Sequence, residues 1–320
     1  MSDPLFDAAV DGDRRSLARA ISRIDDRATG TLEAIGSLSP RRIGGPGKPF
    51  VLGITGPPGA GKSTFTDKLI TRARTRGEKV AVVAVDPSSP FSGGAILGDR
   101  LRMEGHATDP NVFIRSLASR GHLGGLSRAS GQVVDLLDAA SFDLIIVETV
   151  GVGQSELAVM EVADTVLVVL TPESGDVVQT MKAGLLEVAD LFVVNKSDRP
   201  GANALQRNLE LMVHLDMPLQ STDSHWAIPV ATCSATENDG IDEVVDSALA
   251  HLEWCCGPGR PAWDRRRAVG RVRTFLDVVS EDARSYALDA LRDEHAALRL
   301  GLEAGDINPY QAAADWGTKG

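Results

Sequence analysis

The sequence predicts an α/β fold, with a mostly parallel sheet covered by helices and helical extensions at both ends of the chain. Two observations lead to this prediction. Short runs of Val, Ile and Leu recur between residues 50 and 230, with helical stretches between many of them. Unbroken apolar runs of this kind are typical of strands buried on both faces. Outside this region the alternation stops, and apolar residues recur at helical spacing.

The 320 residues are enough for one large α/β domain with appendages, or for two domains. Two stretches rich in proline and glycine mark the expected boundaries, SPRRIGGPGKP at 39–49 and GPGRP at 257–261. We therefore expect a helical extension and linker over 1–48, the α/β domain over 49–256, and a helical arm over 257–320.

Composition excludes several classes of protein. Apolar residues make up 43% of the chain, and no apolar run approaches the ~18 residues of a membrane span. The acidic start, MSDPLFDAAVDGD, lacks the basic-then-apolar order of a signal peptide. A net charge of −11 argues against nucleic acid as the main partner. We expect a cytoplasmic protein with no membrane and no nucleic-acid partner.

The first 38 residues show helical periodicity. Leu17, Ile21 and Ile24 fall on one face, and Leu32 and Ile35 continue the pattern after a break at Thr29–Gly30. The strands and helices expected after the linker are Phe50–Ile54, Val80–Val85, Val112–Ile114, helix Leu126–Ala140, Leu144–Val147, Val166–Leu170, helix Met181–Val188, Leu191–Val194 and Ile228–Val230. In such sheets ligands bind at the carboxyl ends of the strands.

A glycine-rich turn follows the first expected strand. Gly56, Gly61, Lys62 and Ser63 fit the spacing G-x-x-x-x-G-K-[ST], in which backbone N–H groups and a helix N-terminus surround phosphates. A lysine at this position contacts the β- and γ-phosphates. The sequence therefore predicts a nucleoside triphosphate site. The expected phosphate-binding residues are Gly56, Gly59, Ala60, Gly61, Lys62, Ser63, Thr64 and Gly151.

Phosphoryl transfer also needs carboxylates near Mg²⁺. Glu148 ends the strand Leu144–Val147, Asp86 ends the second strand, and Asp99 closes the segment after it. With the Ser63 hydroxyl they form the expected Mg²⁺ ligands. Asp86 or Asp99 could be just a turn residue, but their place in a Gly- and Pro-rich loop at the expected ligand edge of the sheet favours a metal or switch role. The expected catalytic residues are Lys62, Asp86 and Glu148.

A base-reading motif follows the strand Leu191–Val194. Asn195, Lys196 and Asp198 form N-K-x-D, whose aspartate accepts two hydrogen bonds from guanine donors that adenine lacks. One strand later, Ser234 and Ala235 fit an accessory guanine loop. GTP and GDP are therefore the expected ligands. Val152 stands where Ras-like proteins have a water-positioning Gln, so we expect slow hydrolysis unless a partner completes the site.

The apolar pattern of the C-terminal arm predicts a helix, because apolar residues recur there at helical spacing: Val269, Val272, Phe275, Leu276 and Val279. The arginine run 265–267 is interpreted as a solvated face. His251 and Cys255, four residues apart, could form a metal pair but are more typical of ordinary helix residues.

Long stretches of the chain resemble the MeaB/ArgK family of P-loop GTPases, which are G-protein chaperones of adenosylcobalamin-dependent acyl-CoA mutases such as methylmalonyl-CoA mutase. The resemblance covers about residues 1–255. The strings that carry it are GITGPPGAGKST, VAVDPSSPFSGGAILGDR, FIRSLASRGHLGGLSRAS, IIVETVGVGQSE and VVNKSD.

The resemblance implies a homodimer that gates cobalamin loading and protects or rescues the mutase. It also implies that 174–182 is a mobile switch coupling the two proteins, in which Asp176 and Lys182 are our candidates. The chain departs from the family at 171–175, reading TPESG in place of the common LPGAG. Two other functions stay open: a GTPase chaperone for metal insertion, and a small-molecule kinase.

Overall fold

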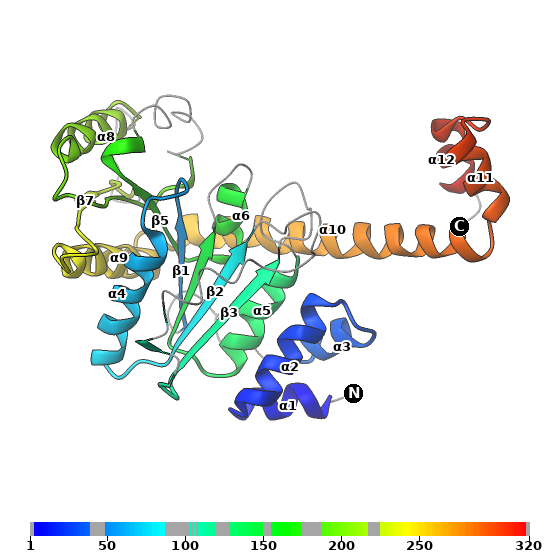
Figure 1. Cartoon of the computed structure of the whole chain (residues 1–320), viewed down its shortest axis with the longest axis horizontal. Coiled ribbons are helices and arrows are strands. Elements are labelled where there is room, and N and C mark those ends of the chain that lie inside the picture. Colours follow the sequence, from blue (N-terminus) through cyan, green and yellow to red (C-terminus); the bar gives the residue numbers. More distant parts are fainter. Residues whose placement is uncertain are drawn as a thin grey trace. The chain divides into compact units, whose positions relative to one another are not determined.

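The computed structural model describes residues 3–38, 49–86, 103, 105–106, 108–118, 128–149, 155–174, 187–216 and 225–317. Figure 1 shows the chain as alternating strands and helices followed by a long C-terminal helix. The elements before the last strand are α1 (Pro4–Val10), α2 (Arg14–Asp25), α3 (Thr31–Gly36), β1 (Phe50–Thr55), α4 (Lys62–Thr75), β2 (Val80–Asp86), β3 (Val112–Ala118), α5 (Arg128–Ala139), β4 (Leu144–Thr149), α6 (Ser155–Val162), β5 (Thr165–Leu170), η3 (Pro172–Ser174), β6 (Leu191–Val194) and α8 (Ala202–Asp216). They are followed by β7 (Val230–Thr232), α9 (Ile241–Cys256), α10 (Arg260–Asp293), α11 (Ala296–Ala304) and α12 (Pro309–Gly317).

The seven strands form one sheet in the order β3-β2-β4-β1-β5-β6-β7, and every neighbouring pair is parallel. The predicted α/β fold with a mostly parallel sheet is therefore confirmed. In a parallel sheet all carboxyl ends meet at one edge. The register places Glu148 of β4 beside Ile54 of β1, next to the turn that follows β1.

The predicted strands agree with the observed ones to within two residues at each end except for β3; β4, for example, continues to Thr149 instead of ending at Val147. On one edge, β3 continues to Ala118 beyond the predicted end at Ile114, paired with β2 along its whole length. On the other, β7 begins at Val230 rather than at Ile228. Pro229 precedes this strand and contributes only its carbonyl, which accepts from the backbone N–H of Phe192, because proline has no N–H to donate.

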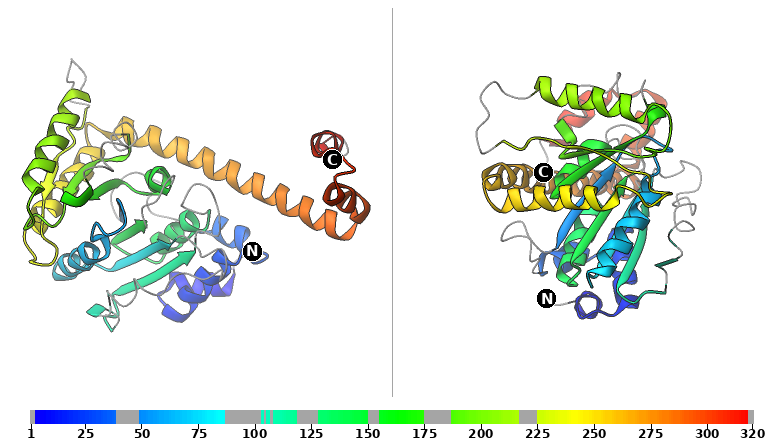
Figure 2. Two further views of the ribbon diagram at one scale, coloured as in Figure 1. Left: turned by 45° about the horizontal axis from the view of Figure 1, so that its top comes forward. Right: turned by 90° about the vertical axis from the view of Figure 1, so that its left-hand side faces the viewer.

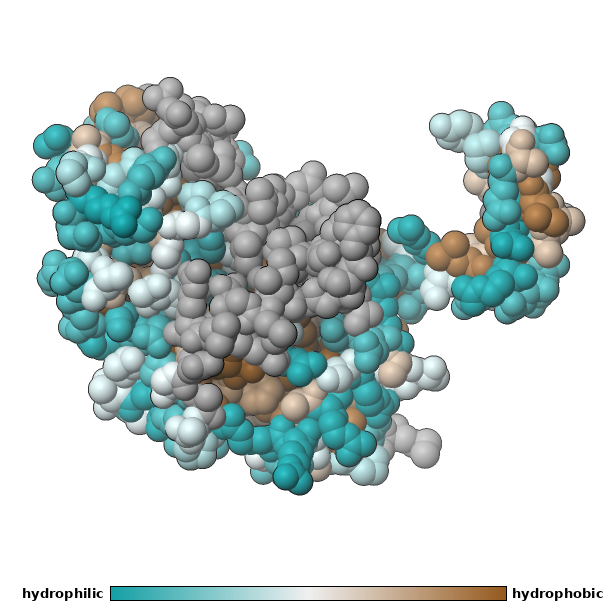
Figure 3. All heavy atoms as spheres, viewed as in Figure 1, coloured by the Kyte–Doolittle hydropathy of each residue, from teal (hydrophilic) through white to brown (hydrophobic). Residues whose placement is uncertain are grey.

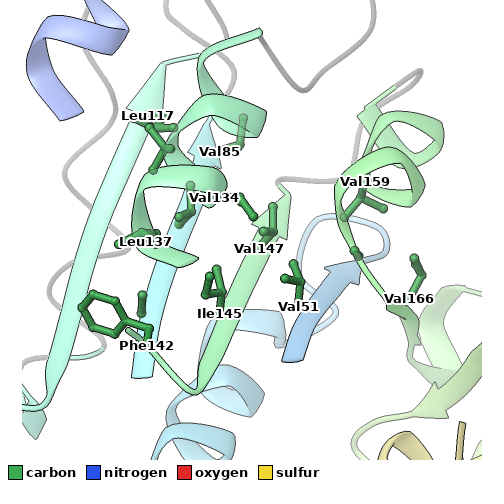
Figure 4. Packing of buried hydrophobic residues seen from close by; sticks show 14 of the residues in the cluster. Val51, Val85, Leu117, Val134, Leu137, Phe142, Ile145, Val147, Val159 and Val166 are labelled. Carbon is green, nitrogen blue, oxygen red and sulfur yellow. The ribbon is translucent and has the colours of Figure 1, made fainter. Parts of the chain in front are cut away.

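Helices cover both faces of the sheet, as Figures 1 and 2 show. Alternate residues of each strand point to opposite faces, so Val51 of β1 packs on one side and Leu52 on the other. The first side is covered by the N-terminal helices, α5, α6 and α8. Figure 4 shows how Val134 and Leu137 of α5 and Val159 of α6 face the strand residues of this core. The second side is covered by α4 and α9.

The N-terminal extension is helical, as its periodicity predicts. Leu17, Ile21 and Ile24 of α2 are buried, and all three N-terminal helices contact α5. Arg115 of β3 donates to Ser22 Oγ over 2.8 Å, which adds a polar contact between α2 and the sheet. The extension is therefore packed against the domain by an apolar face.

The start of α10 is held by two ion pairs, so the prediction of a solvated arginine run is wrong for Arg266 and Arg267, whereas Arg265 is exposed as predicted. Arg267 pairs with Asp164, and only 6% of the Arg267 side chain is exposed. Arg266 pairs with Asp190, with its NH1 3.1 Å from Oδ2. These carboxylates precede β5 and β6, at the edge of the sheet opposite the carboxyl ends. The residues next to an arginine in sequence do not show whether it has an ion-pair partner far along the chain.

Contacts divide the chain into two units, residues 1–270 and 271–320, with the division inside α10. The predicted domain boundaries at 48/49 and 256/257 stay predictions. In the second unit, the rings of His295 and Trp316 lie 5.2 Å apart, and Gly301 packs against Ile307. Figure 3 shows apolar side chains at the surface of this unit. Within the described ranges, no helix has the length and apolarity needed to cross a bilayer.

Candidate functional site

The turn between β1 and α4 has glycines where other residues would clash. Gly56 has a φ of 138°, and a Cβ there would lie 2.0 Å from the carbonyl oxygen of Val169 in β5. Gly61 has a φ of 82°, and its Cβ would lie 2.5 Å from Asn195 Nδ2. Both the left-handed backbone and the close approach exclude a side chain. The turn therefore lies tightly against β5 and the residue that follows β6.

Lys62 begins α4 and folds back across this turn. Its Nζ donates to the carbonyls of Gly56 over 2.7 Å and of Pro57 over 3.0 Å, and the residue is 7% exposed. The ammonium group is therefore held over the concave turn, at the positive end of the α4 dipole. Of the other predicted phosphate-binding residues, Gly59 lies at the tip of the turn with a φ of 77°, and Thr64 lies in the first turn of α4.

Glu148 lies against the same helix. It is 2% exposed, and its two carboxylate oxygens accept hydrogen bonds from Ser63 Oγ at 2.7 Å and from Thr66 Oγ1 at 2.8 Å. The structure thus brings together two of the predicted metal ligands. Thr66 was not predicted from the sequence, although its position three residues after Ser63 places it on the same helix face.

This donor set fits Mg²⁺. The ion prefers oxygen ligands and is commonly bound by one or two protein groups together with substrate phosphates. Ser63 and Glu148 supply a hydroxyl and a carboxylate beside the phosphate turn. Asp86 ends β2, one strand away from β1 with β4 between them, but the structure does not describe its side chain. Asp99 and Gly151 lie outside the described residues, as do the switch residues Asp176 and Lys182.

Asn195, directly after β6, joins two loops of the site. Its Nδ2 donates to the carbonyl of Ala60 in the phosphate turn over 2.8 Å. Its Oδ1 accepts from the backbone N–H of Ala235 over 3.1 Å and from that of Lys196 over 2.8 Å. One buried amide therefore fixes the phosphate turn to the loop after β7.

The carboxylate of Asp198 is oriented by the loop after β7. Ser234 Oγ donates to Asp198 Oδ1 over 2.6 Å, and this bond holds the pKa of Asp198 below its usual value. The loop itself is closed by two backbone hydrogen bonds between Ser234 and Asp239. Asp198 is exposed, and its lowered pKa keeps it ionised at neutral pH.

Lys196 lies beside Asp198 in an unusual backbone conformation. Its φ is 58°, a left-handed value that costs energy for a residue with a Cβ. Its Nζ lies 3.9 Å from Glu173 Oε2, and Glu173 also pairs with Arg199 at 2.5 Å. The Arg199 bond lowers the pKa of Glu173 to about 2. The five predicted guanine-binding residues thus lie on two neighbouring loops.

A parallel sheet with a G-x-x-x-x-G-K-S turn between its first strand and a helix defines a P-loop nucleotide-binding protein. Comparisons with known proteins narrow this class. The family described as "Methylmalonyl Co-A mutase-associated GTPase MeaB" matches residues 17–289. GTPase ArgK of Escherichia coli (strain K12) is 42% identical over an alignment of 312 positions, which covers 91% of this chain and 91% of that protein.

Two further relatives agree with this match. The "Methylmalonic aciduria type A homolog, mitochondrial" of Mus musculus is 37% identical over 323 residues, covering 97% of this chain and 77% of that protein. A solved structure of a "LAO/AO transport system kinase" has a TM-score of 0.66 and 26% identity, covering 98% of this chain and 97% of that one. The chain belongs to the MeaB family, and it is a GTPase.

Proposed function

We propose that this GTPase serves an adenosylcobalamin-dependent acyl-CoA mutase of the methylmalonyl-CoA mutase type. In this proposal it gates the loading of cobalamin and protects or reactivates the mutase. The family description, which names association with that mutase, supports the partner. The hydrogen bonds of Asn195 to Ala60 and Ala235 support the structural part of the proposal, because they join the phosphate turn directly to the loop after β7.

In the proposed chemistry, each group of site residues at the carboxyl ends of the strands has a separate role. The turn from Gly56 to Thr64 binds the phosphates, with the Lys62 ammonium group against the β- and γ-oxygens. Ser63 and Glu148 would hold Mg²⁺, together with Asp86 and Asp99, and the ion would neutralise charge that develops on the phosphates. The loops at 195–198 and 234–235 read guanine.

Hydrolysis without a partner is proposed to be slow, because Val152 stands where Ras-like proteins have a water-positioning Gln. Binding of the mutase against 174–182 would complete the site, with Asp176 and Lys182 as the coupling residues. Completion of this kind raises turnover by about 10³–10⁵ in other GTPases. We expect a smaller but clear stimulation here. We also propose that the protein is a homodimer.

The test is GTP turnover with and without a purified methylmalonyl-CoA mutase, for the parent protein and for Lys182→Ala. The proposal expects the mutase to accelerate phosphate release by the parent and to accelerate it less for Lys182→Ala. Lys68→Ala, a change of the same kind on α4, is the matched control and is expected to respond as the parent does. A mutase that binds without changing turnover would overturn the gating proposal.

A small-molecule kinase is the second candidate, favoured by the similarity to the LAO/AO transport system kinase. A kinase would move the γ-phosphoryl group to an added acceptor, whereas a G-protein releases it to water. Labelled γ-phosphate found on an added small-molecule acceptor would support the kinase. A metal-insertion chaperone has less support, because the described residues contain no group of three or more His, Cys, Asp and Glu side chains that could hold a metal.

A further inference from the structure

Thr66 lies one turn along α4 from Ser63, and the sequence did not identify it as a site residue. Its side chain is completely buried, with 0% of the residue exposed. Its hydroxyl donates to Glu148 Oε2 over 2.8 Å, while Ser63 donates to Oε1 over 2.7 Å. The carboxylate is therefore held at both oxygens by one helix.

The two hydroxyls have different tasks in the proposed site. The Ser63 oxygen is the group that P-loop proteins give to Mg²⁺. Thr66 begins the second turn of the same helix and can continue to hold Glu148 when Ser63 is engaged. A glutamate has three side-chain torsions, and an oriented partner is what fixes such a ligand for its metal. The Thr66 hydroxyl is fully buried, so loss of its hydrogen bond to Glu148 would leave a polar group away from water and cost stability.

We propose that Thr66 is a positioning residue for Mg²⁺, acting through the carboxylate of Glu148. This inference rests on the proposed metal role of Ser63 and Glu148. It predicts that loss of the hydroxyl weakens Mg²⁺ binding while leaving the metal-independent part of nucleotide binding in place.

The experiment compares Thr66→Val, which keeps the branched shape and removes the hydroxyl, with Thr66→Ser, which keeps the hydroxyl. Thr71→Val is the matched control, because Thr71 lies on α4 as well but donates to the backbone carbonyl of Asp67 over 3.0 Å. The readout is the Mg²⁺ concentration that half-maximally slows release of a fluorescent GDP, measured without any turnover. GDP affinity in EDTA is measured in parallel.

Thr66→Val is expected to raise the half-saturating Mg²⁺ concentration by about tenfold, the lower end of the range for the loss of a group that orients a metal ligand. Thr66→Ser and Thr71→Val are expected to match the parent within about twofold, as is the GDP affinity of Thr66→Val in EDTA. If Thr66→Val does not fold, Thr66→Ala removes the same hydroxyl without placing a methyl group beside the carboxylate.

Two results would overturn the inference. One is an unchanged Mg²⁺ response in Thr66→Val when Glu148→Gln weakens it, which would leave the proposed metal site standing. The other is an equal loss of GDP affinity with and without Mg²⁺, which would make Thr66 a purely structural residue. An unchanged response in Glu148→Gln and Ser63→Ala as well would instead refute the metal site itself.

Discussion

In our proposal, the Asp198 side chain on the loop after β6 distinguishes guanine from other bases. Its carboxylate is oriented by Ser234 over 2.6 Å and accepts, in our proposal, two hydrogen bonds from guanine. Asp198→Asn replaces an acceptor with a donor and is expected to lower GTP affinity by about 10- to 100-fold, because the base donors lose a charged acceptor, the stronger kind of hydrogen-bond partner. Affinity for xanthosine triphosphate, whose carbonyl replaces the guanine amine, is expected to rise.

Calorimetry with the two nucleotides measures this exchange. Glu253→Gln removes one carboxylate on an exposed position of α9 and is the matched control, with both affinities unchanged. If Asp198→Asn lowers the affinity for GTP and for xanthosine triphosphate equally, the assignment of Asp198 to guanine recognition is contradicted, and the substitution has damaged the loop instead.

At the residue scale, the sequence predicts site residues that lie in one continuous segment. It does not predict side-chain contacts between residues that are far apart along the chain. The spacing of Gly56, Gly61, Lys62 and Ser63 identifies the phosphate turn because the chemistry needs those residues in one continuous segment. The hydrogen bond from Thr66 to Glu148 joins residues 82 positions apart. A single threonine inside a helix forms no distinctive sequence pattern, so its role could not be predicted from the sequence.

At the element scale, the first turns of α10 are attached to the sheet by the carboxylate of Asp164. Asp164 Oδ2 accepts from the backbone N–H of Val51, and Oδ1 accepts from Trp263 Nε1 over 3.1 Å and from Arg267. The side chains of Asp164 and Arg267 are 1% and 6% exposed. Removing one partner of a buried pair leaves the other charge without compensation.

Asp164→Asn is therefore expected to lower the free energy of unfolding by about 3–5 kcal/mol. Asp264→Asn is the matched control on the same helix, because Asp264 pairs with Arg260 at 2.9 Å with side chains 52% and 41% exposed. Exposed pairs contribute about 0–1 kcal/mol. Urea unfolding of both variants measures the difference, and equal losses would show that burial does not set the strength of this attachment.

His251 of α9 adds a pH-dependent contact to the same edge of the sheet. It is 2% exposed, its Nδ1 lies 2.7 Å from Thr165 Oγ1, and its ring packs against Trp226. Burial lowers the pKa of His251 below its ordinary value of 6.5, although the Asp190 carboxylate opposes the shift. The folded protein therefore favours the neutral ring.

The sign of the pH effect follows from this lowered pKa. The contribution of His251 to stability is fully present above pH 6.5 and is lost as the pH falls from there through the folded pKa, because the unfolded chain takes up a proton first. We expect the loss of unfolding free energy between pH 7.5 and 5.5 to be smaller for His251→Gln than for the parent. Denaturant titrations at the two pH values measure it, and an identical loss would place the pH dependence elsewhere.

The elements differ in how far the sequence predicts them. The central strands are unbroken apolar runs, so their positions are clear from composition, although β4 continues through Glu148 to Thr149. β7 is an edge strand of three half-buried residues, and its start is set by Pro229 and by pairing with β6, which local hydrophobicity does not show. The arginines 266 and 267 look like a solvated run because their acidic partners lie 76 and 103 residues away in sequence.

At the scale of the whole molecule, the order of the strands in the sheet determines where the nucleotide site forms. The parallel arrangement brings the ends of β1, β4, β6 and β7 to one edge, so that motifs spread from residue 56 to residue 235 meet. This convergence is predictable from sequence, because buried parallel strands have a common direction. The helical arm over 257–320 is less predictable from sequence. Its periodicity predicts a helix but does not show what covers the apolar face of that helix.

The apolar row of α10 leads to our last prediction. Val269, Val272, Leu276 and Val279 follow a heptad pattern, continued by Tyr286, and each of them is exposed in the single chain. Val272, Leu276, Val279 and Tyr286 are 60%, 55%, 48% and 68% exposed. Burying such a row against a second copy would remove apolar area from water at about 25 cal/mol per Å².

Leu276→Asp places a charge in the middle of this row and is expected to convert the proposed dimer into a 33.9 kDa monomer. Leu215→Asp is the matched control, because Leu215 of α8 is 76% exposed but lies outside the heptad row, and its dimer is expected to persist. Sedimentation velocity over a range of concentrations measures the mass of each. GTP turnover without a partner is expected to be unchanged in Leu276→Asp, because the row contains none of the predicted nucleotide-binding residues. A dimer that survives Leu276→Asp would place the interface on another surface, and a parent that sediments as a monomer would contradict the proposed dimer.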